Sequence, residues 1–332
     1  MDPLTQGLLG ATAVANSRIA KAPRGAALGL GFLGGMAADL DVLIRSSSDP
    51  LLFLEFHRQF THSLVFIPLG GILCGLVLHA LFAKRKGFSR WQSILFCTLG
   101  YATHALLDAC TTYGTQLYWP FSNERVSWNI MSIVDPLYTL PIALLLGISL
   151  SLQRAWLARI ALFWVFAYPT IGWWQRDRAE SIGRELAASR QHQVLSLSAK
   201  PSFANLLLWK VIYRTPDAFY VDAVRMGIKP KVIEGAAVAP LDIPRDLPWL
   251  QAGSQQAIDL ERFRWFSQDY IALAADNSHR VIDLRYSLLP NEIEALWSIE
   301  LSPSNSEQHV RYITQRGDSR AKSAELWRML FY

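Results

Sequence analysis

The chain has 332 residues, of which 51% are hydrophobic and 18% are charged, against about 25% charged in an average soluble domain. This composition excludes a disordered chain, a collagen, a coiled coil and a disulfide-rich mini-protein. The three cysteines, Cys74, Cys97 and Cys110, lie inside apolar runs without the spacing of a metal site. The net charge of +5 does not indicate a nucleic-acid partner, because many basic residues fall in short loops between apolar segments.

Apolar runs long enough to cross a bilayer, roughly 17–25 residues, all lie before about residue 175. The first run is the weakest, because Thr5, Gln6 and Asn16 interrupt it. The sequence therefore predicts about six membrane spans, which are Pro3–Ile19, Ala26–Ile44, Leu64–Ala83, Trp91–Cys110, Ile133–Leu152 and Trp156–Trp174.

The basic residues are distributed unequally between the predicted loops. The richer loops hold Arg18, Lys21 and Arg24; Lys84, Arg85, Lys86 and Arg90; and Arg154 and Arg159, whereas the alternate loops hold Arg45, Arg58 and Arg125. Because loops rich in Lys and Arg stay in the cytoplasm, both termini are expected on the outer side.

The fold class expected is a polytopic α-helical membrane domain, residues 1–175, followed by a soluble α/β (α+β) domain, residues 176–332. The second domain is then extracytoplasmic. It begins with an amphipathic helical stretch, Arg176–Leu197, and continues with strand-like runs at Leu206–Tyr213, Ala218–Val224 and Tyr270–Ala274.

Asp and His residues gather on the outer side of this topology. Such residues are costly at a membrane, so each is a candidate for function. They come from separate segments: Asp2, Asp39 and Asp41, His57 and His62 with Arg58 and Thr61 between them, His104 and Asp108, and Asp135.

Imidazole and carboxylate groups are typical ligands of zinc, with manganese or iron as alternatives. His104 and Asp108 share one helix face at i,i+4, whereas His57 and His62, about 140° apart on a straight helix, share a site only if their segment bends. The predicted metal ligands are Asp39, Asp41, His57, His62, His104 and Asp108, enough for a two-metal site.

The predicted catalytic residues are Asp41 or Asp135 as a general base and Arg58 with Thr61 as phosphate partners.

Each of these Asp and His features also has a purely structural interpretation. His79 is expected to be a packing residue, the His104–Asp108 pair can be a buried hydrogen bond, and Asp135-Pro136 can be a helix N-cap. Asp39 and Asp41 can simply end a helix. A metal site is favoured because the whole set shares one membrane face.

Four segments, MDPLTQGLLGA, GGMAADLDVL, FHRQFTHSL and THALLDACTTYGTQLYWPFS, resemble the YdjM-like family of bacterial inner-membrane proteins over about residues 1–150. That resemblance implies metal-dependent hydrolysis and location in the bacterial inner membrane. Its matched residues are Asp39, Asp41, His57, His62, His104 and Asp108. The H-x-x-x-D pattern is also similar to the zinc-dependent phospholipase C group, which implies a phosphoester. One position departs from the pattern, since many relatives have His where this chain has Gln6.

The sequence thus predicts a multi-pass membrane hydrolase with a divalent metal, zinc or manganese, acting on a lipid-linked or amphiphilic phosphoester in contact with the bilayer. The alternatives are a non-catalytic membrane metal-binding sensor or regulatory protein and, third, a transporter. Charges at one face and not at the midplane argue against transport. The C-terminal domain is expected to cap the site or to bind a partner.

Overall fold

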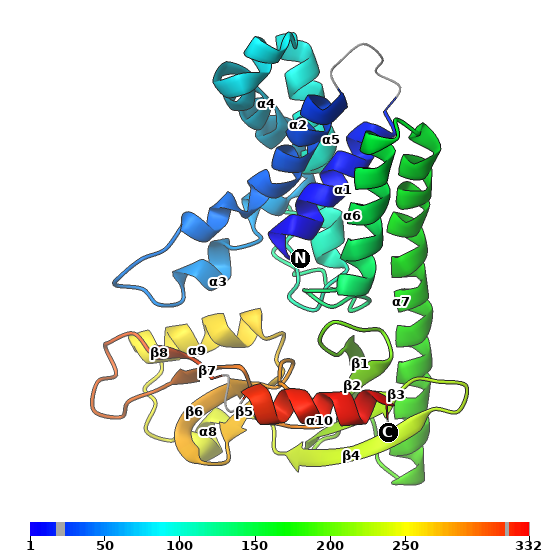
Figure 1. The fold of residues 1–332 in the computed structure, drawn as a ribbon. Helices are drawn as coiled ribbons and strands as arrows, with labels where there is room; N and C mark the ends of the chain where they lie inside the picture. Colours follow the sequence, from blue (N-terminus) through cyan, green and yellow to red (C-terminus); the bar gives the residue numbers. More distant parts are fainter. Residues whose placement is uncertain (18–23, 316–318, 332) are drawn as a thin grey trace. The chain divides into compact units, whose positions relative to one another are not determined.

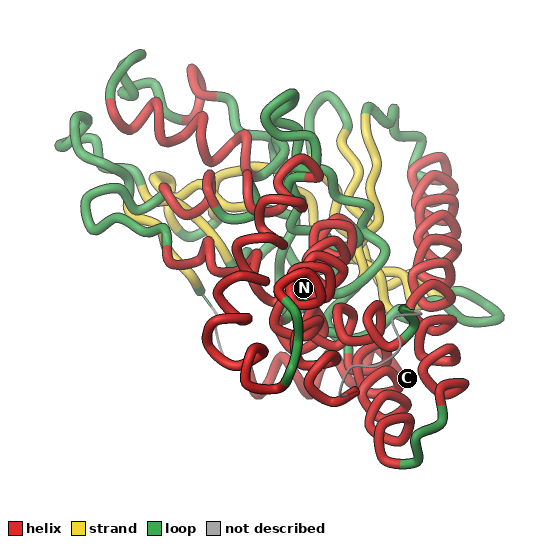
Figure 2. Tube along the Cα trace, turned by 90° about the horizontal axis from the view of Figure 1, so that it is seen from above, coloured by secondary structure: helices red, strands yellow, loops and turns green. Residues whose placement is uncertain are grey.

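The computed structural model describes residues 1–17, 24–315 and 319–331. The chain divides into two compact units (Figure 1). The first comprises Met1–Leu43 and Phe56–Trp173, and the second comprises Ile44–Glu55 and Trp174–Tyr332. In the described residues the strands all belong to the second unit, while the first is built from helices (Figure 2).

The first unit consists of α-helices joined by short 3-10 and π turns. Asp2 caps the first helix by accepting a hydrogen bond from the Thr5 amide, and Ser89 and Gln92 form a capping box at the start of α5. Its elements are α1 (Pro3–Ala15), α2 (Arg24–Met36), η1 (Ala37–Leu43), η2 (Phe60–His62), η3 (Leu64–Phe66), α4 (Ile67–Leu78), η4 (His79–Ala83), η5 (Lys84–Lys86), α5 (Arg90–Ala109) and α6 (Pro136–Ser151).

Glycines allow three of these helices to approach closely. Gly10 on α1 and Gly100 on α5 both face the carbonyl oxygen of Gly31 on α2, and a Cβ at either position would overlap with that oxygen. Backbones can therefore meet where any larger residue would hold them apart, as is common between membrane helices. This packing places the end of α2 beside the end of α5.

Within the described residues, three helical segments are long and apolar enough to cross a membrane: Arg24–Leu43, Leu64–Lys86 and Ala155–Ser189, with mean hydropathies of 1.5, 2.3 and 1.3. This is fewer than the six predicted spans. Helix α1 has 13 residues and α6 has 16, so at about 1.5 Å per residue both are shorter than a hydrocarbon core of about 30 Å. Helix α5 has 20 residues, but buried polar groups such as Ser93, His104 and Asp108 interrupt its apolar character.

The second unit contains two antiparallel four-stranded sheets with the strands in sequence order, β1-β2-β3-β4 and β5-β6-β7-β8. The predicted strand-like runs correspond to β2, β3 and β5, so the mixed α and β character is confirmed. Its elements are β1 (Ser196–Pro201), β2 (Leu208–Arg214), β3 (Phe219–Arg225), β4 (Lys231–Val238), α8 (Ile243–Asp246), α9 (Gln255–Phe266), β5 (Ile271–Ala274), β6 (Asn277–Asp283), β7 (Trp297–Glu300), β8 (Arg311–Thr314) and α10 (Ser319–Phe331).

The predicted helical stretch Arg176–Leu197 is helical as far as Ser189, and its last residues, Ser196 and Leu197, begin β1. One 35-residue helix, α7 (Ala155–Ser189), runs from the first unit into the second without a break. Pro169 and Gly172 lie within this helix and do not end it, and it ends before Gln191, whose φ of 58° is left-handed. A further short helix, α3 (Leu52–Phe56), lies in the segment between η1 and η2.

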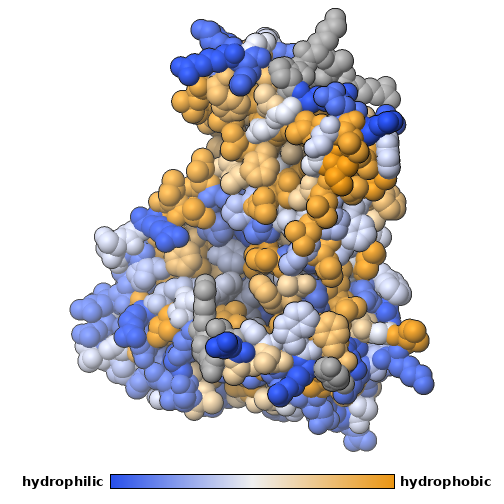
Figure 3. Space-filling model, in the orientation of Figure 1, coloured by the Kyte–Doolittle hydropathy of each residue, from blue (hydrophilic) through white to orange (hydrophobic). Residues whose placement is uncertain are grey.

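The surfaces of the two units differ in polarity. Figure 3 shows apolar side chains gathered over the helical unit and hydrophilic ones over the β-sheet unit. Residues such as Leu69, Leu81 and Phe163 are 50%, 63% and 71% exposed on the helices. By contrast, Ile212, Val221 and Leu284 are fully buried in a core formed from both sheets. The exposed apolar helices are consistent with contact with lipid.

Candidate metal centre

His104 and Asp108 lie in the last turns of α5, and both side chains are completely buried. Their i,i+4 spacing directs both to the same helix face, as the sequence predicts. The carbonyl oxygen of Gly35 on α2 orients the His104 imidazole, because it lies 2.5 Å from Nδ1 of that ring. A carbonyl can only accept, so Nδ1 of His104 carries the proton and Nε2 faces Asp108.

Asp39 and His62 approach from two other elements. Asp39 lies in η1, directly after α2, and its Oδ1 is 3.4 Å from Nε2 of His104. His62 ends the short helix η2, and its Nε2 is 3.5 Å from the same Asp39 oxygen. The side chain of Asp39 is 17% exposed whereas that of His62 is fully buried. Asp39 therefore forms the side of the cluster nearest to solvent.

The segment between His57 and His62 is bent. Arg58 has a φ of 65°, a left-handed conformation that is rare for a residue with a side chain. The bend separates the two histidines, with ring centres 6.0 Å apart at an interplanar angle of 80°. As a result, His62 joins the cluster with His104, and His57 enters a neighbouring group.

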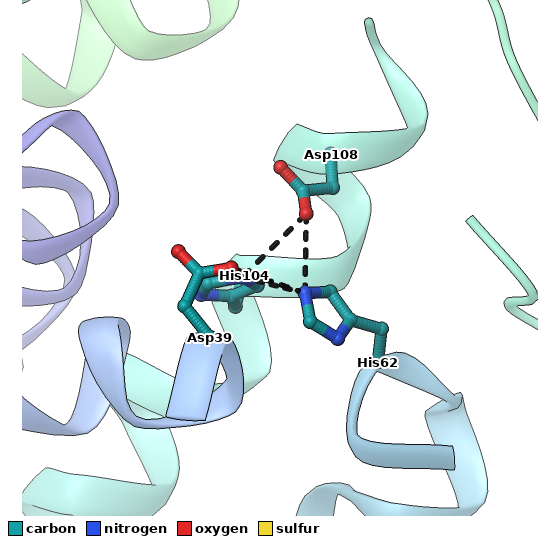
Figure 4. Close-up of side chains that lie close together, drawn as sticks. All are labelled: Asp39, His62, His104 and Asp108. Carbon is teal, nitrogen blue, oxygen red and sulfur yellow. Dashed lines mark hydrogen bonds and ion pairs between the residues drawn. The ribbon is translucent and has the colours of Figure 1, made fainter. Parts of the chain in front are cut away.

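Four ligand atoms converge from three separate stretches of chain (Figure 4). The Nε2 atoms of His62 and His104 are 2.9 Å apart, and Oδ2 of Asp108 lies 3.2 Å from the first and 3.6 Å from the second. In a tetrahedral site with metal–ligand distances of about 2.0–2.2 Å, ligand atoms lie roughly 3.3–3.6 Å apart. The residues Asp39, His62, His104 and Asp108 therefore could hold a metal ion.

Asp41 orients His62. Nδ1 of His62 lies 2.9 Å from Thr61 Oγ1 and 3.2 Å from Asp41 Oδ2. Because the Thr61 hydroxyl donates its own proton to Asp41 at 2.9 Å, its oxygen accepts from His62. Both imidazoles are thus protonated at Nδ1 in their neutral forms and direct the Nε2 lone pair into the cluster. Carboxylate and carbonyl groups commonly orient metal-bound histidines in this way.

The two oxygens of Asp108 have different surroundings. Oδ1 accepts a hydrogen bond from Gln6 Nε2 at 2.9 Å and contacts the α-amino group of Met1. Oδ2 is buried and accepts no hydrogen bond within the described chain, although Arg58 Nε lies 3.0 Å away as an ion pair. Oδ2 therefore faces the Nε2 atoms of His62 and His104, where it is available as a metal ligand.

A second group, Asp39, Asp41 and His57, also has ligand atoms within 4.8 Å of one another and shares Asp39 with the first. Asp41, however, is already engaged by protein donors. Its Oδ1 lies 2.8 Å from His57 Nδ1, and its Oδ2 accepts from the Arg58 amide at 2.9 Å as well as from Thr61. The geometry fits an orienting carboxylate better than an open ligand.

Arg58 is held at the edge of the cluster. Its Nη1 donates to Thr111 Oγ1 at 3.0 Å, and its guanidinium lies 4.6 Å from the centre of the Tyr113 ring. The Arg58 side chain is therefore fixed beside Asp108 by a hydrogen bond and a cation–π contact.

The carboxylates attract positive charge to the cluster. Burial by itself would lower the pKa of His62, but hydrogen bonds with Asp108, Asp39 and Asp41 raise that pKa to about 10. For His57, which is next to Arg58, burial lowers the pKa despite the hydrogen bond with Asp41. The carboxylates thus favour positive charge at the two histidines, as a proton on His62 or as a metal ion.

Asp135 lies apart from both groups. It occupies the N-cap position of α6, before Pro136, but its side chain makes no capping hydrogen bond. Instead, both of its oxygens accept from the Tyr168 hydroxyl at 2.8 Å. The structure therefore does not bring the predicted alternative base to the metal cluster.

A family model described as "YdjM inner membrane protein" matches residues 1–179. The chain belongs to the YdjM inner membrane protein family. It is 32% identical over 154 residues to the Escherichia coli (strain K12) "Inner membrane protein YbcI", covering 44% of this chain and 82% of that protein. It is also 25% identical over 103 residues to the "Uncharacterized protein YfhP" of Bacillus subtilis (strain 168), covering 31% of this chain and 30% of YfhP. No solved structure matches.

This YdjM family member is a membrane protein, and all four residues of the cluster lie inside the matched region. Sequence reasoning noted Gln6 only as a departure from the family pattern, and in the structure it donates to Asp108. It missed three further residues, since Gly35 contacts His104 through its carbonyl oxygen and Thr111 and Tyr113 hold Arg58. The signal available for these three was their position inside the motif segments, because supporting contacts of this kind are not tied to one residue type.

Proposed function

We propose that this protein is an integral membrane metal-dependent hydrolase that acts on a phosphoester at the outer face of the inner membrane. The supporting observation is that one carboxylate oxygen from Asp39 and one from Asp108 each lie within 3.6 Å of the Nε2 atoms of His62 and His104. A divalent cation held there would supply Lewis acidity toward a phosphoryl oxygen and lower the pKa of a water molecule.

Coordination number separates catalysis from a structural site. Four protein ligands close a tetrahedral zinc site, whereas a catalytic site keeps a position open. A six-coordinate ion such as manganese, or zinc with a fifth ligand, would leave room for substrate beside Asp39, the partly exposed member. We therefore propose manganese or five-coordinate zinc as the active form.

The residues around the cluster suit a phosphate. Arg58 is already oriented by Thr111 and Tyr113, and a guanidinium matches phosphate oxygens in bidentate geometry. Once a metal ion neutralises the Asp108 carboxylate, the Arg58 guanidinium would be released from this ion pair and could bind the negatively charged phosphate of the substrate. Thr61, the other predicted phosphate partner, donates to Asp41 and supports His62.

An amphiphilic substrate is favoured by the apolar surface beside the ligands. Leu40 and Leu43, on the same short helix as Asp39 and Asp41, are 64% and 76% exposed, and Val65, close after His62, is 57% exposed. Exposed apolar side chains at a membrane helix end are suited to contact acyl or isoprenoid chains. A lipid-linked phosphoester could then present its headgroup to Arg58 and the metal cluster.

The test is hydrolysis by the full chain in detergent micelles, loaded with zinc or manganese, on phospholipids, isoprenoid phosphates and a chromogenic phosphodiester. We expect turnover that a chelator abolishes, that His104→Ala removes and that His79→Ala retains. His79 is the matched control, since it is a buried membrane-helix histidine whose Nδ1 lies 3.0 Å from Ser93 Oγ. Absence of turnover with every metal, in protein that binds metal, would favour the sensor or regulatory alternative.

A further inference from the structure

The segment Ile44–Glu55 connects two of the stretches of chain that carry residues of the metal centre. It follows η1, which carries Asp39 and Asp41, and precedes the stretch that carries His57 and His62. Although both flanking stretches belong to the first unit, this connecting segment belongs to the second unit, with the β-sheets.

Apolar contacts fix the segment within the second unit. Leu51 is completely buried and Leu54 is 2% exposed. The ring of Phe53 packs edge-on against Tyr312 of β8, with 5.1 Å between ring centres. A connecting loop of this kind normally stays at the surface, so the burial indicates that its position is specified.

Arg262 on α9 is the main polar anchor of the segment. Its two terminal nitrogens donate to the two oxygens of Asp49, at 3.0 and 2.8 Å, and its Nε donates to Glu55 at 2.5 Å. Asp259 accepts a further bond from Nη1 at 2.9 Å. One guanidinium thus holds two carboxylates of the segment in a fork geometry that lysine does not reproduce.

The two ends of the segment meet at the metal centre. Asp41 lies just before it and His57 just after it, and these two side chains are joined by a 2.8 Å contact between Oδ1 and Nδ1. A free connection of this length would have to lose conformational entropy each time its ends came together. Anchoring Asp49 and Glu55 removes much of that freedom in advance.

We propose that Arg262 is a positioning residue for the metal centre, through which the C-terminal unit controls the placement of Asp39, Asp41 and His57. This inference rests on the metal centre of the proposed function, and it deepens that function by assigning a role to the C-terminal unit. Releasing the segment would let η1 move relative to η2, so the four ligand atoms would converge less often.

The experiment titrates the full chain in detergent micelles with Co²⁺ alone and records its visible absorption, which reports coordination geometry. We expect Arg262→Met to weaken Co²⁺ binding about tenfold, the lower end for groups that orient metal ligands, and to change the spectrum. Arg262→Lys should recover part of the loss. The matched control is Arg264→Met on the same helix, because Arg264 pairs with Glu261 and Asp269 and should leave binding unchanged.

Glu55→Gln removes one anchor only and tests the same idea if Arg262→Met does not fold. A smaller loss of Co²⁺ affinity in Glu55→Gln would support the proposal. Unchanged affinity and spectrum in either folded variant would contradict it, while the metal centre would stand. Wild-type protein that binds Co²⁺ but hydrolyses nothing would contradict the proposed hydrolase without touching this inference, and wild-type protein that binds no Co²⁺ would overturn both.

Discussion

The Nε2 atoms of His62 and His104 lie 2.9 Å apart, although in the neutral rings neither of these nitrogens carries a proton. Each Nδ1 is committed elsewhere, to Thr61 and Asp41 for His62 and to the Gly35 carbonyl for His104. Two lone pairs at this distance, with carboxylates on both sides, repel one another unless a cation lies between them. A proton would bridge only the two nitrogens, whereas a metal ion also uses Asp39 and Asp108.

The first prediction is that His62→Ala and Asp108→Ala each reduce the metal content of purified protein. Loss of one direct ligand should weaken affinity by more than the roughly 10-fold that orienting residues contribute. Elemental analysis after dialysis, together with a competition titration, measures this. If both variants retain wild-type metal content, the cluster is a buried hydrogen-bond network around a protonated His62.

The second prediction concerns Asp41. Substitution with Asn keeps the size and the acceptor oxygen near Thr61 but removes the charge that faces the two histidines. We expect the affinity for metal to fall roughly 10- to 100-fold while the protein stays folded and fills at excess metal. A variant that binds metal as tightly as wild type but loses turnover would instead identify Asp41 as the general base.

The third prediction is a stoichiometry of one tightly held divalent ion per chain. The second group depends on Asp41, whose two oxygens already accept hydrogen bonds from the protein. His57→Ala should therefore leave the tightly held metal at one ion. Two ions per chain in wild type, falling to one in His57→Ala, would show a dinuclear centre bridged by Asp39.

The fourth prediction concerns topology, which follows from the distribution of Lys and Arg. In a background without Cys74, Cys97 and Cys110, Lys86→Cys should be protected from an impermeant thiol reagent added to intact cells. Glu124→Cys should react with it. Both positions are exposed, so access to the solvent is not in doubt. The reverse labelling pattern would place the metal centre on the cytoplasmic side.

The fifth prediction concerns two buried lysines of the C-terminal unit. Lys200 and Lys210 are cross-strand partners on β1 and β2, and only 2% and 4% of their surfaces are exposed. Burial lowers the pKa of each to about 7, with Arg285 adding to the effect at Lys200. Above that pH the unfolded chain binds protons that the native state does not, so stability should rise with pH up to the ordinary lysine range.

The slope should reach at most about 1.4 kcal/mol per pH unit for each lysine. Urea unfolding of the full chain in micelles, compared between pH 7 and 9.5, measures it, and Lys200→Met should reduce the slope by removing one of the two groups. Equal slopes in wild type and variant would show that Lys200 keeps its proton in the folded state.

The sequence by itself determined the features that depend on local periodicity and residue type. The apolar runs identified a membrane unit before the soluble one, and strand-like runs bounded by Pro- and Gly-containing turns located β2, β3 and β5. The i,i+4 spacing placed His104 and Asp108 on one helix face, and the motif segments identified the family. Local chain geometry is sufficient for each of these inferences, because neighbours a few residues apart have fixed relative directions.

Only the tertiary structure decided which distant groups meet. The bend at Arg58 separated His57 from His62, and the packing of α6 against Tyr168 removed Asp135 from the centre. The number of candidate spans in the described residues fell below six because α1 and α6 have only 13 and 16 residues and because buried polar groups interrupt α5. The anchoring of Ile44–Glu55 by Arg262 joins residues some two hundred positions apart, and such a contact leaves no local signal in the sequence.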